Sequence, residues 1–107
     1  MTLNKFPERF FQFNAWEDGG SLKVFDSKGK NLKYLYKFAD CVVYVDDRLR
    51  RGDLRQDIRD GLPEGYDWPF AILFGRTADE LEIMLFWVAS ELDFQRWTTA
   101  FKQLSSR

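Results

Sequence analysis

The sequence of 107 residues predicts a mainly β fold that is closed by one C-terminal α-helix. Two short apolar segments, residues 70–76 and 82–89, are separated by only five residues, which is typical of two antiparallel strands. A different period follows, in which apolar residues recur at helical spacing: Phe94, Trp97, Phe101 and Leu104. A helix with one apolar stripe must cover an apolar surface, and the two strands before it provide the nearest one.

The start of this helix is marked by its capping residues. Ser90 stands at the N-cap position, and Asp93, three residues later, is placed to complete a variant of the capping box. We therefore expect a helix from Glu91 to about Leu104. The pair Trp68-Pro69 leads into the first of the two strands, where a proline removes no ladder hydrogen bond.

The first half of the chain carries shorter apolar segments separated by turns that contain glycine. Residues 9–16 alternate apolar and polar side chains. Three further strands are predicted from β-branched and aromatic residues: 22–26, 32–38 and 41–45. Residues 1–6 are predicted to form a short first strand that ends at Pro7.

Residues 46–68 interrupt the strand pattern with a charged segment. Five aspartates and five arginines fall between residues 46 and 60, and we interpret them as surface charges that pair with one another. Leu54 and Ile58 are four residues apart and predict a short helix that docks on the fold. Arg51-Gly52-Asp53 matches an adhesion tripeptide of extracellular proteins, which we interpret as a chance match. A connection of this length is either a functional insert or a loop.

The composition excludes several classes of site. The chain has no histidine, which removes histidine general bases and the usual zinc ligand sets. The single cysteine, Cys41, lies in an apolar run and is interpreted as a buried structural thiol. We therefore expect no enzymatic activity, no metal and no cofactor. The net charge of −1 gives no overall field that would attract nucleic acid or an anionic membrane.

The length of the sequence indicates one domain over residues 1–107, in which residues 46–68 form a charged insert loop. No segment has the length of a membrane span, and the chain begins without a secretory leader. Together with the lone cysteine, these features predict an intracellular protein.

The C-terminal pattern resembles that of pleckstrin-homology (PH) domains. The resemblance rests on strand, short turn and strand, followed by Ser90 and, seven residues later, Trp97. Residues 9–13 (RFFQF) similarly resemble the second strand of that family and residues 21–26 its third, so the resemblance covers nearly the whole chain. It implies a seven-stranded antiparallel β-sandwich or barrel capped by one C-terminal helix, with Trp97 as a structural residue that plugs one end.

The resemblance also implies a site for phosphoinositide headgroups at the open end of the sandwich. The basic residues that match the family's site are Lys5, Arg9, Lys28 and Lys30. Pro7 occupies the middle basic position of the family's motif, and Asp79 and Glu80 are expected at the same end, so the site is incomplete and opposed by acids. Solvated turn residues are the other interpretation of the lysines.

The last strand is apolar on both faces, although side chains alternate between the faces of a strand. Its register to Ser90 and the PH pattern predict an inward set of Met84, Phe86 and Val88. The outward residues, and candidates for a protein interface, are then Leu73, Ile83, Leu85 and Trp87. Such a face needs a cover, which is either the segment 46–68 or another protein. Both alternatives remain open.

These features together predict a non-enzymatic PH-like binding module that mediates protein–protein interaction or scaffolding at a membrane compartment. The chain would bind a protein partner or a second copy of itself, and no nucleic acid. The combination resembles divergent PH-like domains of apicomplexan inner-membrane-complex proteins, which implies a cytoplasmic or peripheral membrane location through a partner or an upstream anchor. The alternative function is a phosphoinositide-binding domain for membrane targeting.

Overall fold

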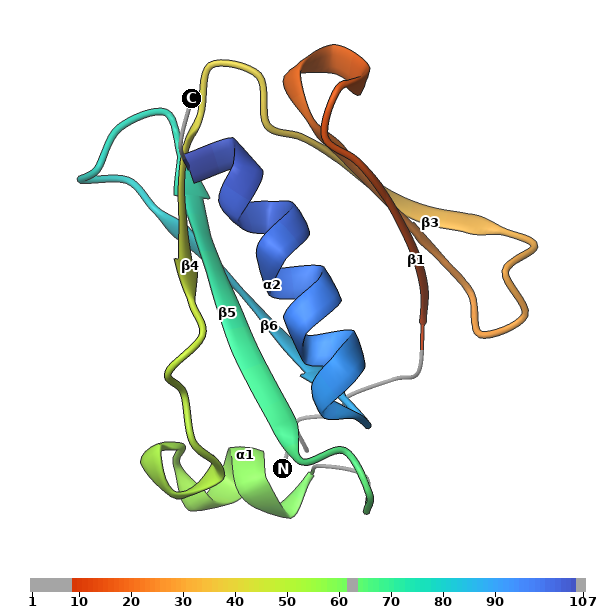
Figure 1. Cartoon of the computed structure of the whole chain (residues 1–107), viewed down its shortest axis with the longest axis vertical. Coiled ribbons are helices and arrows are strands. Elements are labelled where there is room, and N and C mark those ends of the chain that lie inside the picture. Colours follow the sequence, from red (N-terminus) through yellow and green to blue (C-terminus); the bar gives the residue numbers. More distant parts are fainter. Residues whose placement is uncertain (1–8, 62–63, 106–107) are drawn as a thin grey trace.

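The computed structural model describes residues 9–61 and 64–105, and within them the chain forms two antiparallel sheets and one long C-terminal helix (Figure 1). The first sheet consists of β1 (Phe10–Asn14), β2 (Ser21–Phe25) and β3 (Leu32–Lys37). The second sheet consists of β4 (Val42–Asp46), β5 (Trp68–Gly75) and β6 (Glu82–Val88). The helices are α1 (Gln56–Asp60) and α2 (Glu91–Ser105), with 3-10 turns η1 (Glu17–Gly19) and η2 (Arg51–Asp53). The prediction of a mainly β class with a C-terminal helix is confirmed.

The expected seven strands and closed barrel are wrong for the part of the chain that the structure describes, which holds six strands. The strand orders are β1-β2-β3 and β4-β5-β6, and the hydrogen-bonded ladder stops between β3 and β4. There the chain turns at Asp40, which has a φ of +60°, and passes to the other sheet. The strand predicted over residues 1–6 lies outside the described residues.

The core is formed jointly by both sheets and α2, which lies between them in Figure 1. The largest fully buried side chains are Phe38, Phe70, Phe101, Leu22 and Ile72. Each such side chain contributes roughly 1.5–3 kcal/mol through burial. The ring of Phe101 joins the two sheets, because its centroid lies 4.5 Å from that of Phe13 on β1 and 5.7 Å from that of Phe86 on β6.

The helix α2 begins where the capping residues predict. The Asp93 backbone N–H donates to Ser90 Oγ at 3.1 Å, so Ser90 is the N-cap. Trp97 is only partly buried: its ring stacks on Phe101 at 6.0 Å between centroids and meets Phe11 edge-on at 6.1 Å. We expected Trp97 to close one end of the core as a buried residue. The fully buried aromatic residue of the apolar stripe of α2 is instead Phe101.

Two positions refine the strand predictions. Pro69 belongs to β5 and pairs with Trp87 of β6, but the β4 ladder ends at Ala71, so its missing N–H costs no bond to β4. Cys41 is a free thiol that is partly buried and packs against the core, rather than fully buried. Cys41 directly precedes β4, where burial is incomplete.

Candidate interaction surfaces

The strand β6 presents one face to the core and the other outward. The residues of β6 that pack in the core cluster are Met84, Phe86 and Val88, which is the predicted inward set. On the opposite face Ile83 is 67% exposed, whereas Leu85 and Trp87 are partly buried. The outward face is therefore uncovered at one end of the strand and shielded at the other.

The uncovered end forms a row across all three strands of the second sheet. Strand pairing aligns Tyr44 of β4 with Leu73 of β5 and Leu73 with Ile83 of β6. We call these three residues the outer row. Tyr44 is 47% exposed, and Leu73 between the two outer residues is partly buried. The row extends toward Val42, which is exposed as well.

Tyr44 and Val42 are absent from the sequence-derived candidates. Tyr44 alternates with Val43 and Val45, both of which belong to or pack against the core. That alternation is the signal in the sequence that places Tyr44 outward. Its position beside Leu73 depends on strand register, which the sequence does not give.

The shielded end of the same face contains buried residues of β5. Pro69 is buried and pairs with Trp87, and Ala71 is 4% exposed and pairs with Leu85. The short helix α1 lies at the end of the sheet where β5 begins (Figure 1). Burial near Trp87 therefore coexists with exposure at Ile83, and both alternatives for the cover of this face stay predictions.

The basic candidates lie around the turn between β2 and β3. Lys5 lies outside the described residues. Arg9 directly precedes β1, and the neighbouring Phe10 pairs with Phe25 and packs against Gly29 of the turn. Lys28 and Lys30 are exposed in that turn. Arg9 and these two lysines thus lie at the same end of the first sheet, and their role as a headgroup site stays a prediction.

The acids expected at that end are elsewhere. Asp79 and Glu80 belong to the turn between β5 and β6, which lies across the molecule from the β2–β3 turn in Figure 1. That expectation was wrong because the two sheets diverge, so turns that share an end in a closed sandwich are separated here. We call the turn between β2 and β3, which carries Lys28 and Lys30, the lysine turn. The carboxylates of Asp79 and Glu80 do not lie beside it.

The lysine turn has its own acid, Asp26, which is held in place. Asp26 Oδ1 accepts from the Lys30 backbone N–H at 2.9 Å, and Asp26 Oδ2 accepts from Asn31 Nδ2 at 2.8 Å. The Lys30 bond is the main reason why the pKa of Asp26 lies below its ordinary value, with burial opposing it. The carboxylate thus fixes the turn that displays Lys28 and Lys30.

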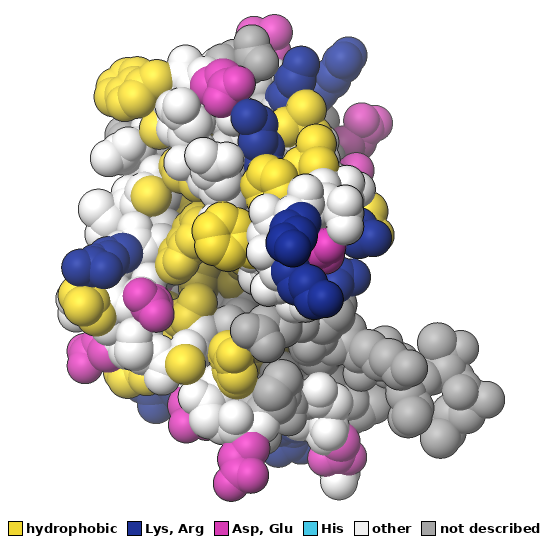
Figure 2. All heavy atoms as spheres, turned by 90° about the vertical axis from the view of Figure 1, so that its right-hand side faces the viewer, with side chains coloured by type: hydrophobic (Ala, Val, Ile, Leu, Met, Phe, Trp, Pro, Cys, Tyr) yellow, Lys and Arg dark blue, Asp and Glu magenta, His cyan; other side chains and the backbone are white. Residues whose placement is uncertain are grey.

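Basic side chains concentrate on β2, β3 and their turn. Five of the chain's seven lysines fall between residues 21 and 37, against one acid, Asp26. They are Lys23, Lys28, Lys30, Lys33 and Lys37. Figure 2, which looks onto the side of the molecule where this hairpin projects, shows basic side chains beside exposed hydrophobic ones. The hairpin is a local basic surface in a chain whose net charge is −1.

Carboxylates in and after the last residue of β4 accept backbone hydrogen bonds and form an ion pair with α2. Asp46 and Asp53 accept from the backbone N–H groups of Arg48 and Arg50, each at 3.1 Å. Asp47 forms an ion pair with Lys102 of α2, and this hydrogen bond lowers the pKa of Asp47 below its ordinary value against the opposing effect of burial. The expectation of pairing only among the segment's own charges is therefore incomplete.

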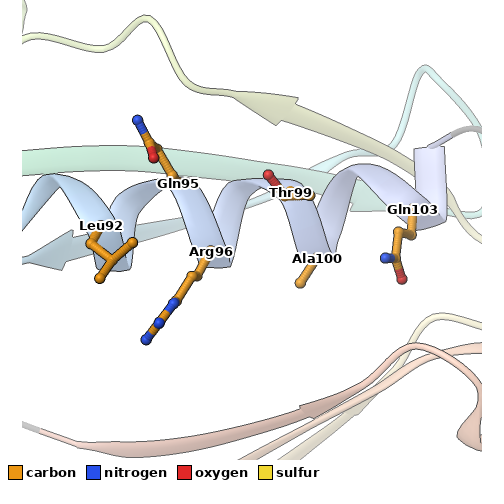
Figure 3. A pocket seen from close by; sticks show the side chains of 6 residues that line it. All are labelled: Leu92, Gln95, Arg96, Thr99, Ala100 and Gln103. Carbon is orange, nitrogen blue, oxygen red and sulfur yellow. The ribbon is translucent and has the colours of Figure 1, made fainter.

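A shallow hollow of about 390 Å³ lies along the outer face of α2 (Figure 3). Its lining residues are Leu92, Gln95, Arg96, Thr99, Ala100 and Gln103. They all belong to α2, and in Figure 3 Gln95 points away from Arg96 and Ala100. Arg96 is the only charged residue among them, so the hollow lacks converging polar groups.

Residues 9–61 and 64–105 contain no group of three or more acidic, cysteine or histidine side chains placed to hold a metal ion. Within the same ranges, no helix has both the length and the apolar character needed to cross a membrane. No protein-family model, curated protein or solved structure matches the chain.

Proposed function

We propose that the chain is a non-enzymatic binding module that docks on a partner protein through the outer row. The observation that carries the proposal is the alignment of Tyr44, Leu73 and Ile83 on three adjacent strands, with Ile83 67% exposed. Contiguous exposed apolar side chains mark interaction surfaces, and tyrosine is enriched at interface centres.

The size of the row indicates what kind of contact it makes. A stable interface buries about 800 Å² on each partner, which three side chains do not supply alone. The row fits the apolar centre of a contact whose rim is polar. A heterologous partner that adds polar contacts around the row satisfies this requirement.

The wider proposal is that the module is PH-like and serves as a scaffold. Support comes from two antiparallel sheets around one core, from a C-terminal helix capped by Ser90, and from Trp97 packed against that core. Action at a membrane compartment rests on the family resemblance alone and stays a prediction.

The test compares wild-type protein with Ile83→Lys. The matched control is Leu92→Lys, which makes the same kind of change at a residue of α2 that is 55% exposed. Proteins captured by the wild type and by the control but not by Ile83→Lys are then purified and titrated, and we expect Ile83→Lys to weaken binding by about tenfold or more.

Two results would count against this function. If Ile83→Lys binds every captured protein as tightly as the control does, the outer row is not the interface. If sedimentation velocity shows a wild-type dimer that Ile83→Lys abolishes, a second copy of the chain occupies the row instead of a partner.

Phosphoinositide binding is the competing function, and one observation favours it. Arg9 and the exposed Lys28 and Lys30 share one end of the first sheet. Co-sedimentation with vesicles, with and without phosphoinositides, separates the two functions. Binding that depends on phosphoinositide and is lost in Arg9→Ala would favour the competitor.

A further inference from the structure

The strand β3 forms an open edge of the first sheet. Among the described residues β3 pairs only with β2, and the next strand, β4, pairs in the other sheet. Five of the six residues of β3 are exposed. An edge strand leaves the backbone N–H and C=O groups on its far side available to another extended chain.

The two faces of β3 differ in chemistry. Tyr34 and Tyr36 pair with the core residues Val24 and Leu22 of β2, which places them on the inner face. Tyr34 nevertheless remains 56% exposed and stacks on Tyr36 with 6.3 Å between ring centroids. The alternate positions Leu35 and Lys37 are exposed, and so is Lys33, which lies where the register between β2 and β3 shifts.

The charge of the hairpin selects the chemistry of a partner. Residues 21–37 contain five lysines and one acid, and that acid, Asp26, already accepts from the Lys30 backbone N–H and from Asn31 Nδ2. Lys23 has a neighbouring carboxylate, with 4.0 Å between its Nζ and Glu17 Oε1. A positive surface of this kind attracts and orients an acidic partner.

We propose that β3 binds an extended acidic segment of a partner protein by strand addition. Because side chains alternate, the added strand would place one set of residues beside Tyr34 and Tyr36 and the other set beside Leu35 and Lys37, with Lys33 at the start of the edge. The segment that fits has apolar residues alternating with glutamates or aspartates. This site lies on the first sheet and is separate from the outer row of the second.

A peptide strand fits the edge better than an anionic membrane does. A membrane would use the lysine charges but neither the open backbone groups of β3 nor the alternation of its side chains. Strand addition uses all three features at once, and its register is set by backbone hydrogen bonds.

The probe for the test is a short fluorescent peptide of alternating glutamate and valine, measured by anisotropy. Two further peptides carry N-methyl groups on one or the other set of alternate amides, and a third has the same composition with the glutamates and valines in separate blocks. We expect the alternating peptide to bind. One N-methylated peptide and the block peptide should bind about tenfold or more weakly.

The variants are Lys33→Glu with Lys37→Glu, and, as the matched control, Lys28→Glu with Lys30→Glu in the turn. Both reverse two charges, but only the first pair lies on β3. We expect the β3 variant to lose about tenfold or more in affinity and the turn variant about threefold or less. A milder variant, Lys33→Gln with Lys37→Gln, serves if the charge reversal prevents folding.

Three results would overturn the proposal. If the β3 variant and the turn variant lost equal peptide affinity, binding would depend on overall charge and not on β3. Tolerance of both N-methylated peptides would exclude backbone pairing. Binding to phosphatidylserine vesicles without binding to the peptide would make the hairpin a membrane surface. Ile83→Lys should leave peptide binding unchanged, so the proposal for β3 is tested independently of the proposal for the outer row.

Discussion

The strands β3 and β5 are both rich in apolar and aromatic residues but lie in opposite environments, and β3 also carries two lysines. β3 (LKYLYK) is exposed at five of six positions, whereas β5 (WPFAILFG) is buried or partly buried at every position. β5 lies between β4 and β6, while β3 has one partner, β2. Neighbouring strands, and not composition alone, therefore decide whether a strand of this kind becomes core or surface.

The helix α2 accentuates the difference between the two sheets. It packs against all three strands of the second sheet. It reaches the first sheet through ring contacts, such as Phe101 with Phe13 and Trp97 with Phe11. Both three-stranded sheets end in edge strands, and among these β3 is exposed at five of its six residues.

The largest effect is expected at the residue that joins the sheets. Phe101→Ala should destabilise the protein by about 3–5 kcal/mol, because a fully buried aromatic ring is removed between both sheets. Trp97→Ala should cost less, since that ring is partly buried. Denaturant unfolding measures both, and Leu92→Ala on the exposed side of α2 is the control.

The claim that the two sheets share one core would be wrong if one sheet stayed folded in Phe101→Ala. If Phe101→Ala unfolded the second sheet while the first kept its native spectrum, the two sheets would not share one core. If Trp97→Ala lowered the free energy of unfolding as much as Phe101→Ala or more, Trp97 would be the main residue that closes the core.

Much of the second sheet and of α2 could be predicted from the sequence, because local signals coincide there. Ser90 before a helical stripe gives the start of α2, and the Asp93 N–H bond to Ser90 Oγ confirms it. The alternation of Met84 and Phe86 with Ile83 correctly separates the two faces of β6. These signals depend on residues close in sequence.

The features that could not be predicted from the sequence depend on contacts between segments that are distant in the chain. Tyr44 lies beside Leu73 through strand register, and β3 is an edge only because β4 pairs with β5. The partial burial of Trp97 likewise depends on how far the sheets diverge. The family pattern presumed a closed sandwich, which placed Asp79 at the lysine end and added a strand that the described residues do not contain.

A smaller effect is expected from the ion pair that ties α2 to the chain after β4. The pKa of Asp47 is lowered by Lys102, so this pair stabilises the fold at neutral pH, and the stabilisation is lost as the pH falls below about 4 and through the lowered pKa. Both side chains are partly exposed, which limits the contribution to about 0.2–1 kcal/mol.

The measurement is the stability difference between wild type and Lys102→Gln as a function of pH, with Lys28→Gln as the control in the exposed turn. We expect a difference at pH 7 that shrinks on acidification and in high salt. A difference that grew toward low pH would mean that Lys102 acts through some other contact.

The contrast between β3 and β5 is tested most directly by hydrogen exchange of the wild-type backbone amides. The account predicts that Ile72 and its neighbours in β5 exchange among the slowest amides, and that the Leu35 amide of β3, which faces away from β2, exchanges at least about a hundredfold faster. Protection along β3 equal to that of β5, in the monomeric protein, would mean that the edge is covered and would contradict the account.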